Sequence, residues 1–397
     1  ASSFLDSITI DKSNSLPALP AHISCDWSGL KFADAQSGVG ALGDGHGGGP
    51  RAVALFVGAM EKAGSKHFAS DDGSISVSNC MCHSTENLYR YFDSAIARAS
   101  DDFYPREPES WLWHLTACAY NSLLIGQVAL PDWDMFQSRH PAAWPHAAAR
   151  AASGGPVTVS DAPGEHDAEV LRALALPDGT TLGATGSARL CADCLFRDVS
   201  HDGVTALKLA APNGDEAAVL GLYNVQGGHW RRDERRFAFG ENATLACSYK
   251  PRDASVAFDA FDASARWAAY EFRSNAVRVL GADDSVDLTL DPAGFRVVAL
   301  RRLRAWKGVA YAPLGLLDML NGGGAVLACD EGADGVRVTA PAAGDALAFF
   351  SLDDTDGSYD WSAVHRALPS TGEKWVANHW FRIGGLGAPA PDPREDV

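Results

Sequence analysis

The chain has 397 residues, 46% of them hydrophobic and 21% charged, which is typical of a globular protein with two or three domains. Its net charge of −17 argues against a nucleic-acid partner, because such partners bind a basic face. No apolar run approaches the ~20 residues of a membrane-spanning helix. Eight cysteines in so long a chain are not a disulfide framework, so we expect a reducing compartment, the cytoplasm or an organellar stroma.

Residues 1–28 are weakly patterned, and we interpret them as an N-terminal extension. The sequence begins Ala-Ser-Ser-Phe, without Met or a signal-peptide pattern, so we expect a processed chain or a fragment. Gly29–Phe32 predicts a short buried strand that leads to Asp34. The glycine-rich stretch 38–49 lacks the Gly-Lys-Ser/Thr of a phosphate loop, which favours a flexible loop over an active-site mouth.

Between residues 29 and 176, strand-like runs alternate with runs of helical spacing. Helices are predicted over Arg51–Ala69, Glu86–Ala97, Glu107–Gln127, His140–Ala152 and Ala168–Leu176, and strands over Ile75–Met81, Ile96–Ser100, Val128–Leu130 and Val157–Val159. Strand-then-helix units predict parallel strands with crossover helices. We count about five units, whereas a closed barrel needs eight, so we predict a partial (β/α)8-type barrel that lacks its first strands.

Acidic residues follow several of these strands, and they are Asp34, Asp101, Asp102, Asp132, Asp134 and Asp161. The carboxyl ends of parallel strands share one face of a barrel, and paired carboxylates there are what sugar cleavage needs. Trp133 stands between two of the acids and suits a sugar rim, where an aromatic ring stacks on a pyranose. A capped turn without function is the alternative for this segment. Arg98 could orient an acid or simply pair with one.

After residue 177 helical periodicity gives way to short alternating strands, which predicts an antiparallel β-sandwich over 177–328. Examples are Ala218–Tyr223, Val286–Leu290 and Phe295–Leu300. A β-rich segment is expected over 329–383, followed by a disordered tail over 384–397. Cys191 and Cys194 form a single CxxC pair without a second pair, so we predict no zinc site.

Two motifs, Arg98–Pro105 and Pro131–Phe136, carry a resemblance to a known family. The chain resembles the raffinose synthase and alkaline α-galactosidase group, or seed imbibition proteins, of glycoside hydrolase family 36. The likeness extends over roughly residues 29–328 and includes His140–Ala143, Val159–Asp161, Leu176–Gly179 and Gly221–Asn224. It implies an α-galactosidase-type barrel followed by a β-sandwich, and catalysis with retention at the anomeric carbon.

The resemblance implies Asp34 as the nucleophile, from the family's Lys-Val-Asp strand end, and Asp102 as the general acid/base, from Arg-x-Ser-Asp-Asp. Lys31-Phe-Ala-Asp34 has one residue more than the family motif, and such a shift turns a strand side chain to the other face. The candidate sugar-binding residues are Lys31, Arg98, Asp101, Trp133, Asp134 and Asp161. Neither a metal nor a cofactor is expected.

The resemblance implies α-galactosyl transfer or hydrolysis on raffinose-family oligosaccharides, with galactinol or raffinose as donor and sucrose or water as acceptor. The alternative is a catalytically inactive subunit with a structural role in a larger assembly. An open barrel exposes strand edges and apolar helix faces, here along Trp111, Leu115, Cys118 and Leu123. We therefore expect a protein partner, or residues 1–28, over the open edge near Gly29–Asp34.

The stretch from Cys329 to residue 383 resembles the end of a prolyl 4-hydroxylase, at Gly344–Ser351 and Gly372–Ala377. His365 and Lys374 would match that family's second iron-binding His and its 2-oxoglutarate Lys. The upstream His-x-Asp pair has no counterpart, and a single His does not hold Fe(II). We therefore predict a β segment without oxygenase activity.

Overall fold

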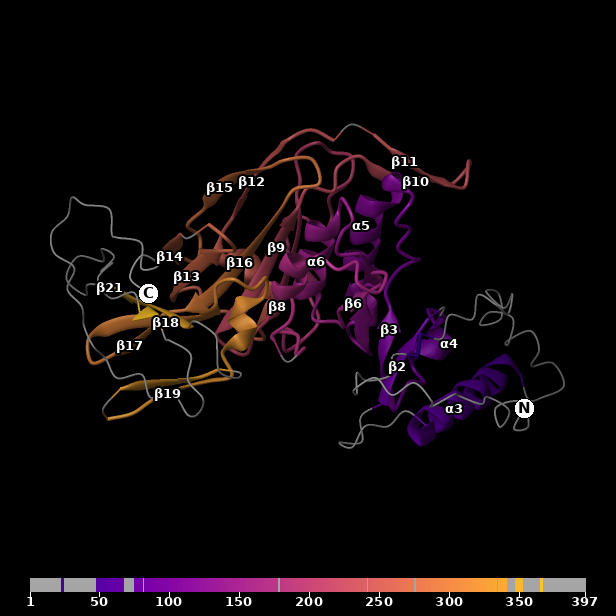
Figure 1. Cartoon of the computed structure of the whole chain (residues 1–397), viewed down its shortest axis with the longest axis horizontal. Helices are drawn as coiled ribbons and strands as arrows, with labels where there is room; N and C mark the ends of the chain where they lie inside the picture. The colour runs from indigo at the N-terminus through magenta and orange to yellow at the C-terminus, as the bar shows by residue number, and fades with distance from the viewer. Residues whose placement is uncertain are drawn as a thin grey trace.

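The fold is taken from a computed structural model, which describes residues 23–24, 48–67, 75–80, 82–177, 179–240, 242–274, 276–333, 335–340, 347–352 and 365–366 (Figure 1). The predicted strand at Gly29–Phe32, with Lys31 and Asp34, lies outside these residues, as does the tail 384–397. A part with parallel strands and helices adjoins a larger antiparallel part.

The N-terminal part is a parallel sheet whose strands alternate with helices along the chain. Its strands pair in the order β1 (Ile23–Ser24), β2 (Ile75–Asn79), β3 (Ser94–Arg98) and β4 (Leu130–Asp132). The intervening helices are α3 (Gly49–His67), α4 (Thr85–Leu88) and α5 (Pro108–Ile125). This alternation of parallel strands and helices confirms the α/β character predicted for the region.

The chain breaks its direction after β4, at Asp134, whose φ of 63° is left-handed. The next strand, β5 (Met135–Phe136), pairs in parallel with β6 (Thr158–Val159) rather than with β3. The segment 130–136 therefore connects the four-stranded sheet to a second parallel pair. Among the described residues these strands form an open arrangement, and no closed barrel is seen.

Helix α6 (Ala143–Ser153) is built largely of alanine and lies between the parallel strands and the antiparallel sheet (Figure 1). Its small side chains allow β8 and β9 to pack closely against it. Gly154 ends the helix with a φ of 74°, and a Cβ there would lie 2.1 Å from the Gly186 carbonyl oxygen. Only glycine satisfies both the left-handed backbone and this close approach.

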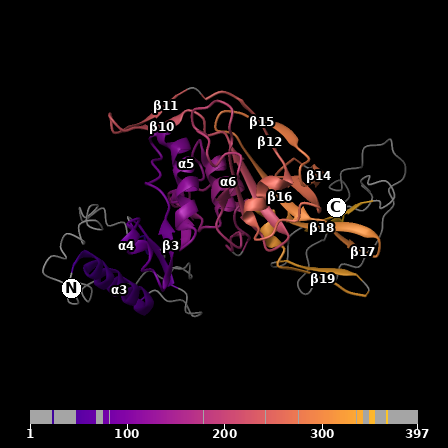
Figure 2. The ribbon, with the colours of Figure 1, turned by 180° about the vertical axis from the view of Figure 1, so that it is seen from behind.

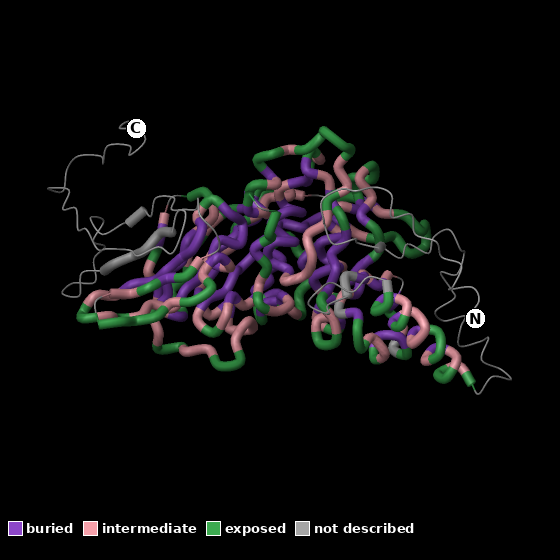
Figure 3. Tube along the Cα trace, turned by 60° about the horizontal axis from the view of Figure 1, so that its bottom comes forward, coloured by how far each residue is buried: buried purple, intermediate pink, exposed green. Residues whose placement is uncertain are grey.

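The antiparallel part is centred on a six-stranded sheet with the order β14-β13-β16-β9-β8-β7. Its strands are β7 (Arg189–Leu190), β8 (Leu207–Pro212), β9 (Ala217–Tyr223), β13 (Arg266–Glu271), β14 (Val277–Gly281) and β16 (Phe295–Arg302). Every residue of β9 is buried, because α6 covers one face and the rest of the antiparallel part surrounds the strand. The buried residues run continuously from the helices into this sheet (Figure 3).

Smaller sheets surround the central one (Figure 2). They are the hairpin β10 (Gly228–Arg231) and β11 (Arg236–Phe239), the pair β12 (Leu245–Tyr249) and β15 (Val286–Leu290), the sheet β17 (Arg304–Trp306), β18 (Val309–Leu316), β21 (Leu347–Leu352) and β22 (His365–Arg366), and the pair β19 (Ala328–Glu331) and β20 (Val336–Thr339). Strand pairing changes from parallel to antiparallel between β6 and β7. The domain boundaries predicted from the sequence stay predictions.

The helix predicted over Glu86–Ala97 is wrong. Only Thr85–Leu88 is helical, and Ser94 begins β3. The Glu61 carboxylate of α3 accepts hydrogen bonds from the backbone N–H groups of Phe92, Asp93 and Ser94, at 2.9, 2.5 and 3.1 Å. This contact from a distant helix fixes the chain as it enters the strand and overrides the local helical pattern.

The apolar stripe predicted to be bare on α5 is also wrong. Leu115 and Cys118 are 1% and 0% exposed, and Trp111 and Leu123 pack against the same core. The stripe is covered within the chain, because the Trp111 ring packs edge-to-face on His140 and the Cys118 thiol lies 3.1 Å from Ser100 Oγ. No helix in the described ranges is long and apolar enough to cross a membrane.

Candidate active site

The site begins with Arg98, the last residue of β3, whose guanidinium meets three carboxylates. Its Nη1 lies 2.9 Å from Asp102 Oδ1, its Nε 3.3 Å from Asp132 Oδ2 and its Nη2 2.8 Å from Asp134 Oδ1. Asp132 ends β4, and Arg98 is its register partner in the sheet. Adjacent parallel strands thus deliver the cation and two of the acids to one edge, as strand ends do in a barrel.

Burial separates these acids into two kinds. The side chains of Arg98, Asp132 and Asp134 are 8%, 9% and 3% exposed, whereas that of Asp102 is 55% exposed. Burial works to lower the pKa of Arg98, but Asp134 and Asp132 raise it above its ordinary value. Burial raises the pKa of Asp134 and the Arg98 cation opposes that rise. Asp132 and Asp134 are therefore buried against Arg98, and Asp102 is the most exposed of the three acids. The sugar-binding role predicted for Asp134 stays a prediction.

The backbone around Asp134 is held from several directions. Its N–H donates to Asp132 Oδ1 at 2.9 Å, and its Oδ2 accepts from the Phe103 N–H at 2.7 Å. Arg150, fully buried on α6, donates to the carbonyl oxygens of Trp133 at 2.7 Å and of Asp134 at 3.0 Å. These bonds hold the left-handed residue, and through Arg98 they fix the position of Asp102.

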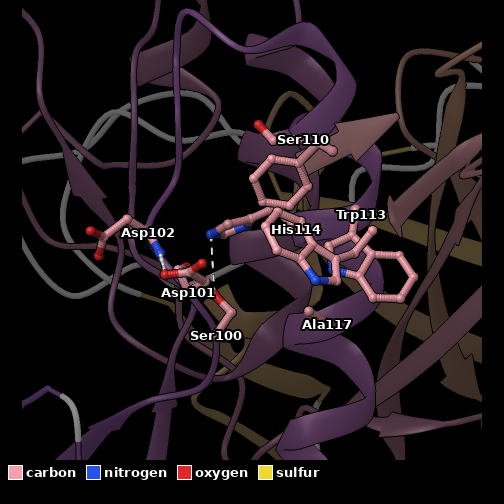
Figure 4. Close-up of a pocket in the computed structure, with 9 residues that line it drawn as sticks. Ser100, Asp101, Asp102, Ser110, Trp113, His114 and Ala117 are labelled. Atoms are coloured by element: carbon pink, nitrogen blue, oxygen red, sulfur yellow. Dashed lines mark hydrogen bonds between the residues drawn. The ribbon is translucent and has the colours of Figure 1, made fainter. Parts of the chain in front are cut away.

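Asp101 and Asp102 line a pocket of about 200 Å³ beside the carboxyl end of β3 (Figure 4). The Asp102 N–H donates to Asp101 Oδ1 at 2.9 Å, and the Tyr104 hydroxyl donates to the same oxygen at 3.4 Å. Burial, reinforced by Asp101 and Asp102, raises the pKa of Tyr104 to about 12, so this hydroxyl keeps its proton. The other lining residues are Ser100, Ser110, Trp113, His114, Ala117, Trp230 and Phe237.

Three aromatic residues of this pocket were not predicted from the sequence. Trp113 comes from α5, whereas Trp230 and Phe237 come from the β10–β11 hairpin of the antiparallel part. A Trp-x-Trp sequence in the first half of α5 was the available signal for Trp113. No local signal connects the hairpin, more than a hundred residues further along, to the acids.

Trp133 does not line the pocket, which corrects its predicted role as a stacking ring. Its side chain is 0% exposed, and its Nε1 donates to Ser122 Oγ of α5 at 3.0 Å. Trp133 lies in the link between β4 and β5, where Asp132 and Asp134 bind Arg98 and the ring of Trp133 lies in the core. The ring supports the turn from beneath and has no face open to a sugar.

Asp161 follows β6 and belongs to a second cluster. It accepts from Ser138 N at 2.7 Å and from Ser138 Oγ at 2.6 Å, and His166 Nδ1 lies 3.1 Å away. Burial works to raise the pKa of Asp161, but these hydrogen bonds from Ser138 and His166 hold it below its usual value. Its role in sugar binding stays a prediction, as do those of Lys31 and Asp34.

The histidines near the site pack with each other and with Phe103. His114 and His146 are buried, and burial together with the Arg150 cation lowers the pKa of both well below 6.5. His114 Nε2 lies 3.2 Å from Ser100 Oγ. Within the described residues no group of three or more His, Cys, Asp or Glu could hold a metal ion.

Comparison with known proteins matches residues 19–356 to the family described as raffinose synthase or seed imbibition protein Sip1. The matched range enters the stretch from Cys329 onward that we compared with a prolyl 4-hydroxylase. Nothing else supports the resemblance to a prolyl 4-hydroxylase. The side chains of His365 and Lys374 are not among those that the structure describes.

Several curated relatives match as well. The chain is 40% identical over 300 residues to the "Probable galactinol–sucrose galactosyltransferase 6" of Arabidopsis thaliana, covering 74% of this chain and 39% of that protein. It is 38% identical over 351 residues to the galactinol–sucrose galactosyltransferase of Oryza sativa subsp. japonica, and the match covers 81% of this chain and 44% of that protein. It is 29% identical to the stachyose synthase of Pisum sativum, and the match covers 67% of this chain and 34% of that protein. The chain thus spans less than half the length of these relatives.

Among solved structures, an α-galactosidase of Saccharomyces cerevisiae aligns with a TM-score of 0.45 at 11% identity, covering 64% of this chain and 69% of that one. An α-galactosidase of Mortierella vinacea aligns with a TM-score of 0.42 at 11% identity, covering 63% of each.

Proposed function

The chain belongs to the raffinose synthase and seed imbibition protein family, and on that premise we propose that it transfers or hydrolyses α-galactosyl groups of raffinose-type sugars. One observation carries the proposal. Within the family's Arg-x-Ser-Asp-Asp motif, Arg98 binds an exposed Asp102 at 2.9 Å beside a pocket at the strand ends. Galactinol as donor and sucrose as acceptor come from the names of the relatives.

The first half of the reaction uses two carboxylates. The nucleophile, assigned to Asp34 by the family motif alone, attacks the anomeric carbon, and the bond from that carbon to the leaving oxygen breaks. The carboxylic acid of Asp102 gives its proton to the leaving oxygen, which departs as an alcohol. The galactosyl group is then held on the nucleophile as an ester, and Asp102 is a carboxylate.

The second half reverses these roles. The Asp102 carboxylate takes a proton from a hydroxyl of sucrose, or from water, and that oxygen bonds to the anomeric carbon as the ester bond breaks. Both halves require Asp102 at a fixed position, within hydrogen-bond reach of the reacting oxygen. Arg98 supplies that position, because its own orientation is fixed by Asp132 and Asp134.

The finer fold assignment, a partial (β/α)8-type barrel, is part of the same proposal. It is supported by the parallel order β1-β2-β3-β4, by the parallel pair β5-β6 and by the acids that follow these strands. A protein partner at the open edge and a reducing compartment stay predictions.

Incubation of the 397-residue chain with galactinol and sucrose, followed by chromatography of the products, tests the proposal. We expect a trisaccharide from transfer, free galactose from hydrolysis, or both. If the chain binds these sugars by calorimetry and forms neither product, the inactive-subunit alternative is correct. A chain that neither binds nor turns over the sugars contradicts the proposal.

A further inference from the structure

We infer that the pocket between the Asp101–Asp102 turn and the β10–β11 hairpin binds the acceptor sugar. This inference rests on the proposed galactosyl transfer and adds to it an aromatic wall, made of Trp113, Trp230 and Phe237, that lies outside the motifs of the resemblance. It also gives the antiparallel part of the chain a direct role in substrate binding, because the hairpin supplies Trp230 and Phe237.

The lining has the chemistry of a carbohydrate site. Trp113, Trp230 and Phe237 supply apolar ring surfaces, and the Asp101 carboxylate beside them supplies acceptors for hydroxyl groups. Sugar rings present C–H faces that pack on aromatic rings and a rim of hydroxyls that need hydrogen-bond partners. Trp230 is 41% exposed, so part of its ring is free to take such a contact. A neutral polyol fits this lining, whereas an anionic ligand would be repelled by the Asp101 carboxylate.

The aromatic rings hold one another in place. The Trp230 and Phe237 ring centroids lie 4.9 Å apart in an edge-to-face arrangement, and Phe237 lies 5.8 Å from Tyr104. Tyr104 in turn donates its hydroxyl to Asp101. The hairpin rings are therefore linked to the acidic turn through side-chain contacts.

Gly228 explains how the hairpin comes so close to α5. A Cβ at this position would lie 2.9 Å from the Trp113 backbone nitrogen and 3.0 Å from Leu112 Cβ. A larger residue would push β10 away from the helix and separate Trp230 from Trp113. At the other end of the hairpin, Arg231 and Arg236 both pair with Glu234, which closes the exposed turn.

The pocket has the position that an acceptor requires. In a retaining reaction the acid/base residue touches the leaving oxygen in the first step and the acceptor hydroxyl in the second. Both oxygens therefore lie near Asp102, which is one of the residues that line the pocket. Figure 4 shows its carboxylate on the side of the turn away from Trp113, so a sugar that fills the pocket must extend past Asp101 to offer a hydroxyl to Asp102 in place of water.

The ratio of galactosyl transfer to hydrolysis, measured in variants of the pocket, tests this inference. With p-nitrophenyl α-galactoside as donor, nitrophenol release reports all turnover, and chromatography in the presence of sucrose reports the part that ends in transfer. We expect Trp230→Ala to lower the ratio of transfer to hydrolysis roughly three- to tenfold, the range for one lost aromatic contact. Gly228→Val should lower it in the same direction.

Trp306→Ala is the matched control, because Trp306 is also a tryptophan on a β-hairpin but belongs to β17, away from the pocket. An unchanged ratio in Trp230→Ala, or an equal change in Trp306→Ala, overturns the inference. If the unmodified chain releases no nitrophenol, the proposed function fails. Titration with sucrose, followed by calorimetry, then tests whether the pocket binds the sugar. Weaker binding by Trp230→Ala than by Trp306→Ala supports the pocket, and equal binding or no binding to the unmodified chain refutes it.

Discussion

The guanidinium of Arg98 and the carboxylate of Asp134 form a buried ion pair, with Nη2 2.8 Å from Oδ1 and side chains 8% and 3% exposed. Asp134 also accepts from the Phe103 N–H, so the pair joins β3, the acidic turn and the end of β4. The exposed Asp102 is the outermost member of this network, because it binds the same guanidinium. The position of the candidate acid therefore depends on a buried ion pair.

Removal of one partner should be costly. Asp134→Asn leaves the Arg98 cation without its nearest buried counter-charge, and we expect the free energy of unfolding to fall by about 3 kcal/mol or more. Urea unfolding followed by circular dichroism measures this. Asp283→Asn, which breaks an exposed pair with Arg252, serves as the control and should change stability far less. Equal losses of unfolding free energy in the two variants would show that the buried ion pair stabilises the fold no more than the exposed pair does.

Arg150 should be as important as the acids, although it binds only backbone carbonyls and His146 near the turn. Replacement by Met keeps the length of the side chain but removes the donors to the Trp133 and Asp134 carbonyls, which are buried. We expect a loss of about 3 kcal/mol or more in unfolding free energy. The exposed Arg139→Met is the matched control. A fully stable Arg150→Met variant would mean that water replaces these donors.

Alanine substitutions at Gly154 and Gly164 distinguish the cost of a left-handed backbone from the cost of a steric clash. Both have positive φ, 74° and 82°, but a Cβ at 154 would meet the Gly186 carbonyl oxygen at 2.1 Å, whereas a Cβ at 164 would meet nothing within 4 Å. Gly164→Ala should cost about 1 kcal/mol, the penalty for a left-handed residue alone. Gly154→Ala should cost more, because α6 must also move away from the segment around Gly186. Thermal unfolding of the two variants makes the comparison, and equal shifts would contradict the clash.

Stability should fall in mild acid because His114 and His146 are buried with depressed pKa values. The unfolded chain binds protons at these residues below about pH 6.5, while the folded chain does not. Unfolding free energy is thus insensitive to them above pH 7 and falls below pH 6.5 by up to about 1.4 kcal/mol per pH unit for each residue. Urea midpoints between pH 7.5 and 5.5 check this. His146→Gln should reduce the slope, and an identical slope would exclude His146 as a contributor.

The sequence predicted elements whose pattern is local. The strand at Ala218–Tyr223, the helix at Glu107–Gln127 and the end of the helix His140–Ala152 were all predicted within one or two residues of β9, α5 and the end of α6. The α/β character of the N-terminal part followed from the alternation of strands and helices, because that alternation predicts parallel pairing. The Arg98–Asp102 pair could also be predicted from the sequence, since the two residues lie four positions apart within one motif.

The errors concern contacts between distant segments. Glu61 decides where β3 begins, from more than thirty residues away. Trp133 lies beside two acids in sequence, but its ring is in the core and donates a hydrogen bond to Ser122 of α5. Trp230 and Phe237 reach the pocket only because β10 and β11 pack on α5. No periodicity within a short window contains this information.

The central claim is that Asp102 is the acid/base of an α-galactosyl transfer, and the leaving-group dependence of Asp102→Asn tests it most directly. Nitrophenol departs without a proton, whereas the alcohol of galactinol needs one. We expect Asp102→Asn to release nitrophenol from p-nitrophenyl α-galactoside in a first turnover while its cleavage of galactinol falls by roughly 10²-fold or more. Equal losses on both donors, in a variant that unfolds like the unmodified chain, would contradict the role of Asp102.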